Sequence, residues 1–147
     1  MADYDPDQTF GFNLYDAARL LRRDFERRAK RHGVTRAQFS ALAYLLRSPG
    51  LKQSQLAEVL EVTPIAVARL VDRMEDEGLV ERRADPGDRR AWRIFLTPKA
   101  QGRLEKLRET GRETREIALA GISPKDQEVL LRALKRVREN LAAATAP

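Results

Sequence analysis

The chain has 147 residues, of which 42% are hydrophobic, and its 28 basic residues outnumber 22 acidic ones to give a net charge of +6. This length and composition predict one globular domain, residues 1–147, with a surface suited to a polyanionic partner. The lack of cysteine excludes disulfides and cysteine-zinc sites, and no apolar run approaches the roughly 18 residues that a membrane span needs.

Hydrophobic periodicity and capping signals divide the chain into helices and one hairpin. We expect helices at about 8–31, 36–47, 53–60, 64–77, 97–120 and 124–143. A hydroxyl residue precedes a proline at Thr63, Thr97 and Ser123, and each of these pairs predicts a capped helix start. Thr35 and Gln38 are spaced as a capping box.

Basic residues are concentrated in two zones. Residues 19–36 contain eight basic and two acidic side chains, and residues 82–93 contain five arginines and two aspartates. Two such zones can form one surface that follows a phosphate backbone. The alternative for the first zone is simply the hydrated face of a helix.

The segments 53–60 and 64–77 are separated by a short turn, and we expect Val62 to lie beneath both helices. The buried face of the second segment is predicted from helical spacing to be Val67, Leu70, Val71 and Met74. The outward face is then Pro64, Ile65, Ala68, Arg69, Asp72 and Arg73. Such a helix suits a major groove, because Ile65 can touch a thymine methyl and Arg69 can fork onto guanine. An ordinary amphipathic helix pair of an α-protein is the alternative.

A basic hairpin follows at residues 79–96, with its turn at 84–88. Trp92, Ile94 and Leu96 alternate onto one face, and we expect Trp92 to lie in the core. A helix-turn-helix followed by a basic hairpin is a winged helix. The predicted fold is therefore mainly α with a small β-hairpin wing, and residues 36–96 form the winged helix-turn-helix lobe. A generic arginine-rich surface hairpin is the alternative.

The sequence resembles the MarR family of transcription regulators. The resemblance rests on QSQLAEVLEVTPIAVARLVDRMEDEGLVERR and DPGDRRAWRIFLTPKA, and on the wing pattern formed by Asp88, Arg90, Leu96 and Thr97. Lys52 departs from the pattern, since the family often has a serine or threonine cap there, and we expect a looser helix start. The resemblance implies a homodimer of triangular outline in which the helices of 8–31 and 97–143 interlock.

Apolar stripes on these outer helices support association independently of the resemblance. They are spaced at alternating intervals of four and three residues. The stripes are Leu14, Ala18, Leu21 and Phe25; Ala100, Leu104, Leu107, Gly111, Thr114 and Ala118; and Leu130, Leu134, Val137 and Leu141. A monomeric bundle is the alternative.

Two sets of site residues follow. The expected DNA contacts are Ser54, Thr63, Pro64, Ile65, Ala68, Arg69, Arg73, Asp88, Arg89 and Arg90. Arg90, with Arg89, is expected to reach a minor groove or its phosphates, and Asp88 to orient Arg90 by a charge-assisted hydrogen bond. Family members commonly release DNA when a small anionic or phenolic effector binds. For such an effector we name Arg19, Arg22 and His32, which periodicity turns away from the main apolar stripe.

We therefore predict a dimeric, sequence-specific transcription regulator, a repressor released by an effector, that binds a near-palindromic double-stranded operator. We expect it in the cytoplasm, associated with the nucleoid, with no cofactor, metal or membrane partner. No nucleophile–base pair or glycine-rich phosphate loop supports an enzyme. The alternatives are a ligand-independent architectural DNA-binding protein and a winged helix that binds another protein.

Overall fold

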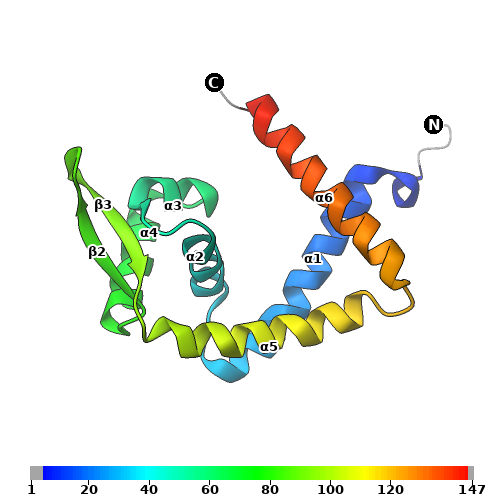
Figure 1. The fold of residues 1–147 in the computed structure, drawn as a ribbon, viewed down its shortest axis with the longest axis horizontal. Helices are drawn as coiled ribbons and strands as arrows, with labels where there is room; N and C mark the ends of the chain where they lie inside the picture. The colour runs from blue at the N-terminus through cyan, green and yellow to red at the C-terminus, as the bar shows by residue number, and fades with distance from the viewer. Residues whose placement is uncertain (1–4, 146–147) are drawn as a thin grey trace. The chain divides into compact units, whose positions relative to one another are not determined.

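A computed structural model describes residues 5–145 and has mainly helices with one small antiparallel sheet (Figure 1). The predicted fold class is confirmed. The elements are η1 (Pro6–Gln8), α1 (Phe10–Ala29), η2 (Lys30–His32), α2 (Arg36–Arg47), β1 (Leu51–Lys52), α3 (Gln53–Val59), α4 (Pro64–Asp76), β2 (Val80–Asp85), β3 (Asp88–Leu96), α5 (Ala100–Ala118) and α6 (Pro124–Thr145).

The chain divides into two compact units, of which the first ends at Arg112 and the second begins at Glu113. The first unit contains the helix-turn-helix, the sheet and the first part of α5, and the second contains the end of α5 and all of α6. None of the helices within residues 5–145 is long and apolar enough to cross a membrane.

Three of the predicted helix starts are confirmed by their hydrogen bonds. Thr35, Thr63 and Ser123 each accept a hydrogen bond through the side-chain oxygen from the main-chain amide three residues later. Gln38 completes the capping box, because its side-chain oxygen accepts from the Thr35 amide. These caps use residues close in sequence and satisfy amides that a helix start leaves unpaired.

The predicted cap at Thr97 is wrong. The Thr97 hydroxyl donates to the carbonyl of Gly78, and the Thr97 amide donates to the carbonyl of Leu79. Thr97 thus extends the pairing of β2 with β3, and α5 begins at Ala100. The first helix also begins and ends slightly inside its predicted range, because Thr9 caps α1 and a 3-10 turn follows Ala29.

The sheet positions the wing. Its strand order is β1-β3-β2, and both pairings are antiparallel. The short β1, which was not expected, pairs Leu51 with Ile94. A Cβ on Gly50 would lie 2.7 Å from the ring of Phe95, and φ there is +77°, so only glycine fits this approach. The tip of the β2–β3 hairpin extends free of α3 and α4 (Figure 1).

The core of the first unit joins the helix-turn-helix to the sheet. The predicted buried face of α4 is confirmed, and it belongs to the same cluster as side chains from α2, α3, β3 and α5. This cluster includes Val67, Leu70, Val71, Met74, Leu42, Leu45, Leu56, Ile94, Leu104 and Leu107. Burying this apolar surface fixes the side of α4 that is left for solvent.

Two apolar residues expected to be buried are exposed instead. Trp92 is 48% exposed, because it lies across from Ala84 on a part of the hairpin beyond the core, whereas Ile94 is fully buried. Val62 is also exposed, in a turn where Glu61 has a φ of +53° and the Val62 amide bonds to the Ala57 carbonyl. The turn is therefore closed by its main chain and does not use Val62 as an apolar anchor.

Two of the three outer helices, α1 and α6, expose much of their apolar stripes, whereas Leu104 and Leu107 of the α5 stripe are buried. On α1, Phe25 is buried with its ring centroid 4.0 Å from that of Phe39, but Leu14 and Leu21 are exposed. In the second unit no residue of α6 is buried, and Leu130, Leu134 and Leu141 are exposed. These faces are thus available for a further contact.

Candidate nucleic-acid interface

The outward face of α4 carries the side chains that were predicted to read DNA. Pro64, Ile65, Arg69 and Arg73 are exposed, and Ala68 is half-buried between them. Ile65 is 67% exposed, an unusual degree for an isoleucine in a helix whose opposite face is in the core. Thr63, the cap of this helix, is also exposed. The buried stripe therefore leaves a narrow, partly basic surface along α4.

The start of α3 was expected to be looser because Lys52 lacks a capping hydroxyl, but a side chain within the helix pairs with the amide of this residue. The Lys52 amide donates to the side-chain oxygen of Gln55 at 2.9 Å, while the Lys52 ammonium group lies 3.9 Å from the Asp85 carboxylate. Ser54 is exposed in the first turn of this helix. Lys52 thus links α3 to the wing, and the Gln55 side chain pairs with the Lys52 amide, which is a different group from the helix amides that a serine or threonine cap would bind.

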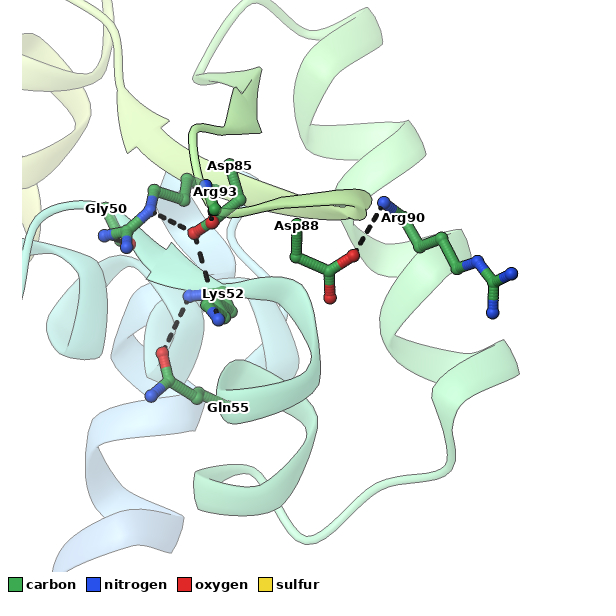
Figure 2. Close-up of polar contacts among 8 residues, drawn as sticks. Gly50, Lys52, Gln55, Asp85, Asp88, Arg90 and Arg93 are labelled. Carbon is green, nitrogen blue, oxygen red and sulfur yellow. Dashed lines mark hydrogen bonds and ion pairs between the residues drawn. The ribbon is translucent and has the colours of Figure 1, made fainter.

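Asp85 organises the junction between the wing turn and the sheet (Figure 2). Its carboxylate accepts from the Gly87 amide at 2.8 Å and from Arg93 Nε at 2.6 Å, and its side chain is only 4% exposed. The Gly87 hydrogen bond, and after it Arg93, hold the pKa of Asp85 below its usual value. The Asp85 cluster, defined as Asp85, Gly87, Arg93 and Lys52, was not predicted from the sequence.

The predicted role of Asp88 needs correction. Its carboxylate accepts from the main-chain amide of Arg90 at 2.9 Å, and the Arg90 guanidinium extends away from it (Figure 2). Asp88 therefore shapes the turn through the main chain and leaves the Arg90 side chain free to reach outward.

Three of the five hairpin arginines are held within the protein. Arg93 binds Asp85, and Arg82 binds Asp72 with a nitrogen–oxygen distance of 2.6 Å. Arg83 pairs with Glu81 and lies over the Phe95 ring, 4.2 Å from its centroid. Within residues 5–145, Arg89 and Arg90 are exposed and have no side-chain hydrogen bond or ion pair. Among the hairpin arginines, the charge available to a phosphate is thus that of Arg89 and Arg90 at the wing tip.

The three residues named for an effector are not brought together. Arg19 is paired with Asp16 at 2.6 Å, and Arg22, one turn further along α1, is exposed. His32 lies about 20 Å along the helical segment from Arg19, given 1.5 Å per residue in α1 and about 2 Å in the 3-10 turn. Its carbonyl accepts a hydrogen bond from Arg103. One small molecule cannot touch both Arg19 and His32 of one chain.

The fold and this surface define a winged helix-turn-helix protein of the DNA-binding class. Residues 32–91 match the sequence profile of the MarR family. The chain is 30% identical over 108 residues to the uncharacterized HTH-type transcriptional regulator YybA of Bacillus subtilis (strain 168), covering 74% of this chain and 72% of that protein. The chain belongs to the MarR family, whose members are DNA-binding transcription regulators and not enzymes.

Solved structures agree with this assignment. A MarR transcriptional regulator from Methanosarcina mazei Go1 has a TM-score of 0.80 at 25% identity, over 92% of this chain and 97% of that one. The Mycobacterium tuberculosis MarR family protein Rv2887, solved in complex with salicylic acid, has a TM-score of 0.74 at 27% identity, over 93% of this chain and 99% of that one.

Proposed function

We propose that this protein is a homodimeric, sequence-specific transcriptional repressor that inserts α4 into the major groove and its wing into the adjacent minor groove. The observation that carries the proposal is the exposed face of α4, with Ile65 and Arg69, in the same compact unit as a wing tip where Arg89 and Arg90 are unengaged. The buried stripe of α4 and the Asp85 cluster hold these two surfaces in place.

The contacts of α4 divide by chemistry. Arg69 is exposed and can form a bidentate contact with guanine, and Ile65 can contact a thymine methyl. The other proposed contacts in the helix-turn-helix are Ser54, Thr63, Pro64, Ala68 and Arg73. Small side chains among them allow close approach, and hydroxyl and guanidinium groups suit phosphate oxygens.

The wing supplies contacts beside the reading helix. Arg90, with Arg89, reaches a narrow minor groove or its phosphates, which attract arginine because of their negative potential. Asp88 takes part by fixing the main chain before Arg90, in the geometry of the 2.9 Å hydrogen bond.

The apolar surface that one chain leaves uncovered supports dimerisation. The exposed large hydrophobic residues of α1 and α6 are Phe10, Phe12, Leu14, Tyr15, Leu20, Leu21, Val129, Leu130, Leu131, Leu134 and Leu141. Apolar surface of this extent marks an interaction site. In the proposed single MarR-type domain, the segments 8–31 and 97–143 form the dimer helices and 36–96 the DNA-binding lobe. A two-fold dimer then requires a near-palindromic operator.

The proposed regulation is release of DNA by a small aromatic carboxylate or phenol. The salicylic acid complex of the M. tuberculosis relative supports this ligand class. Arg22 is the best placed of the named cations, because it is exposed, whereas a ligand at Arg19 must compete with Asp16. His32 lies too far from them on its own chain to share the ligand.

The test is selection of bound sequences from random duplex DNA, followed by release assays with salicylate and related acids. The proposal expects an enriched near-palindrome, protection of two half-sites, and release by an aromatic acid. An enriched palindrome that no acid releases removes the regulatory part and supports the ligand-independent alternative. Binding without any sequence preference overturns the reading role of α4.

A further inference from the structure

We infer that Arg82 is a positioning residue that neutralises Asp72 on the DNA-facing side of α4, and that it is not itself a DNA contact. The inference rests on the proposed function, in which α4 lies against DNA. It separates Arg82 from the wing-tip arginines, with which the sequence alone groups it.

The Arg82 guanidinium is bound on every side by groups of the helix-turn-helix. Its Nη2 atom lies 2.6 Å from Asp72 Oδ1 and 3.3 Å from the Ala68 carbonyl. Its Nε donates to the Gln53 side chain at 3.1 Å, and Nη1 lies 3.4 Å from Glu75 Oε1. The side chain is only 17% exposed. Arg82 therefore links β2 to the first residue of α3 through Gln53. It also places a positive charge beside Asp72 of α4.

Asp72 is the carboxylate whose negative charge Arg82 balances. It lies about one helical turn beyond Arg69 on the outward face of α4, and its side chain is 62% exposed. Within residues 5–145, Arg82 is its one recorded hydrogen-bond and ion-pair partner. Glu75 differs, because its second oxygen also accepts from the main-chain amide of residue 82, a bond that any side chain there retains.

Removing the Arg82 charge would leave a bare carboxylate facing the phosphates. A unit charge several ångströms from a phosphate at a protein surface costs enough to weaken binding by about tenfold at low salt. It would also lower the number of phosphates that the protein effectively neutralises, and so the steepness of the salt dependence.

Arg83 supplies a matched control. It is the next residue of β2, so it lies on the other face of the strand, where it pairs with Glu81 and covers the Phe95 ring. Arg83→Gln removes the same charge from the same strand without changing the charge beside Asp72.

The experiment measures affinity for a mixed-sequence duplex of about 30 base pairs, long enough for two half-sites, across a salt series. Arg82→Gln should bind about tenfold more weakly at low salt, with a salt slope lower by about one unit. The double variant Asp72→Asn with Arg82→Gln should recover most of that loss, to within about threefold of wild type. Arg82→Lys, which keeps the charge, and Arg83→Gln should each stay within about threefold.

Three outcomes overturn the inference. The first is unchanged binding by Arg82→Gln, and the second is an equal loss by the double variant, which would assign Arg82 a purely structural or direct DNA role. The third is a loss of affinity by Arg82→Lys as large as that expected for Arg82→Gln. Because Arg82→Lys keeps the charge, this comparison with wild type tests the inference even if the glutamine variant does not fold. Arg69→Ala, titrated on a duplex that wild type selects from random DNA, separates this from the proposed function. If Arg69→Ala binds normally, α4 does not lie on DNA and both fail; if it binds weakly, only the inference is at stake.

Discussion

Arg93 Nε donates to Asp85 Oδ2 at 2.6 Å, and this bond ties the end of β2 to the neighbouring strand β3. The Asp85 cluster adds the Gly87 amide of the turn and the Lys52 ammonium group beside α3. The wing tip is thereby anchored to the lobe through a nearly buried carboxylate, while Arg90 remains free.

Asp85→Asn should make the free energy of unfolding depend less on pH in the acidic range. Because the pKa of Asp85 is lowered in the folded protein, its contribution to stability is complete above the unfolded pKa of about 4 and is lost as the pH falls through the folded value. Urea unfolding of wild type and variant between about pH 6 and pH 2 measures this. The variant should have a smaller free energy of unfolding than wild type near pH 6. The two values should approach each other as the pH falls toward 2. A constant gap over the whole range would show that Asp85 is not the titrating group.

Arg90→Ala should fold normally and bind DNA more weakly. Its side chain is exposed and unengaged, so its removal leaves the core unchanged. If Arg90 meets phosphate, the salt slope should fall by about one unit on all sequences. If it enters a narrow minor groove, the loss should be larger with A·T-rich than with G·C-rich flanks. Titration of both flank types over a salt series distinguishes the two modes, and unchanged affinity and slope on both would remove Arg90 from the interface.

Trp92 offers a direct spectroscopic view of the wing. It is the single tryptophan of the chain, it is 48% exposed, and it lies two residues after Arg90 on the same strand. Its fluorescence should shift to shorter wavelength or be quenched when double-stranded DNA is added at constant salt, because the wing surface loses water. The change should disappear in a variant with both Arg89 and Arg90 replaced by alanine. An emission spectrum that stays the same at saturating DNA would place the wing away from the duplex.

Leu134→Glu should dissociate the dimer. Leu134 is exposed in the apolar stripe of α6, so a carboxylate there would be buried without a partner on association. Ala143→Glu is the matched control, because it adds the same charge to the same helix about half a turn away from the stripe. Sedimentation should give a lighter species for the first variant only, with weaker DNA binding. Identical sedimentation of both would show that α6 does not form the contact.

Local signals were enough to predict much of the fold. The caps at Thr35 and Thr63 depend on groups three residues away, and the stripe of Val67 and Met74 follows from helical spacing, so both could be identified along the chain. Thr97 had the same local signal as Thr63, but its hydroxyl is used by Gly78, 19 residues earlier. A tertiary partner overrode the cap, and nothing beside Thr97 in the sequence indicates that partner.

The sequence was enough to predict which elements form the site, but not the hydrogen bonds and ion pairs between its side chains. Which arginines are free depends on partners distant in sequence, such as Asp72 for Arg82 and the Gly50 carbonyl for Arg93. The amino-acid composition does not distinguish Arg82 and Arg93 from Arg90, although the first two are hydrogen-bonded within the protein. Asp85 carried a usable signal, since an aspartate two residues before a glycine in a turn often bonds to its amide.

The most direct test of the account compares the sequences that wild type and Arg69→Ala select from random duplex DNA. The account predicts that wild type enriches a near-palindrome with recognition centres about 10–10.5 base pairs apart. Arg69→Ala should lose preference at one symmetric pair of positions, by roughly 1–3 kcal/mol per bidentate contact, and keep the rest of the motif. An identical motif for both proteins, or a single unpaired half-site bound with full affinity, would contradict a dimer that reads DNA through α4.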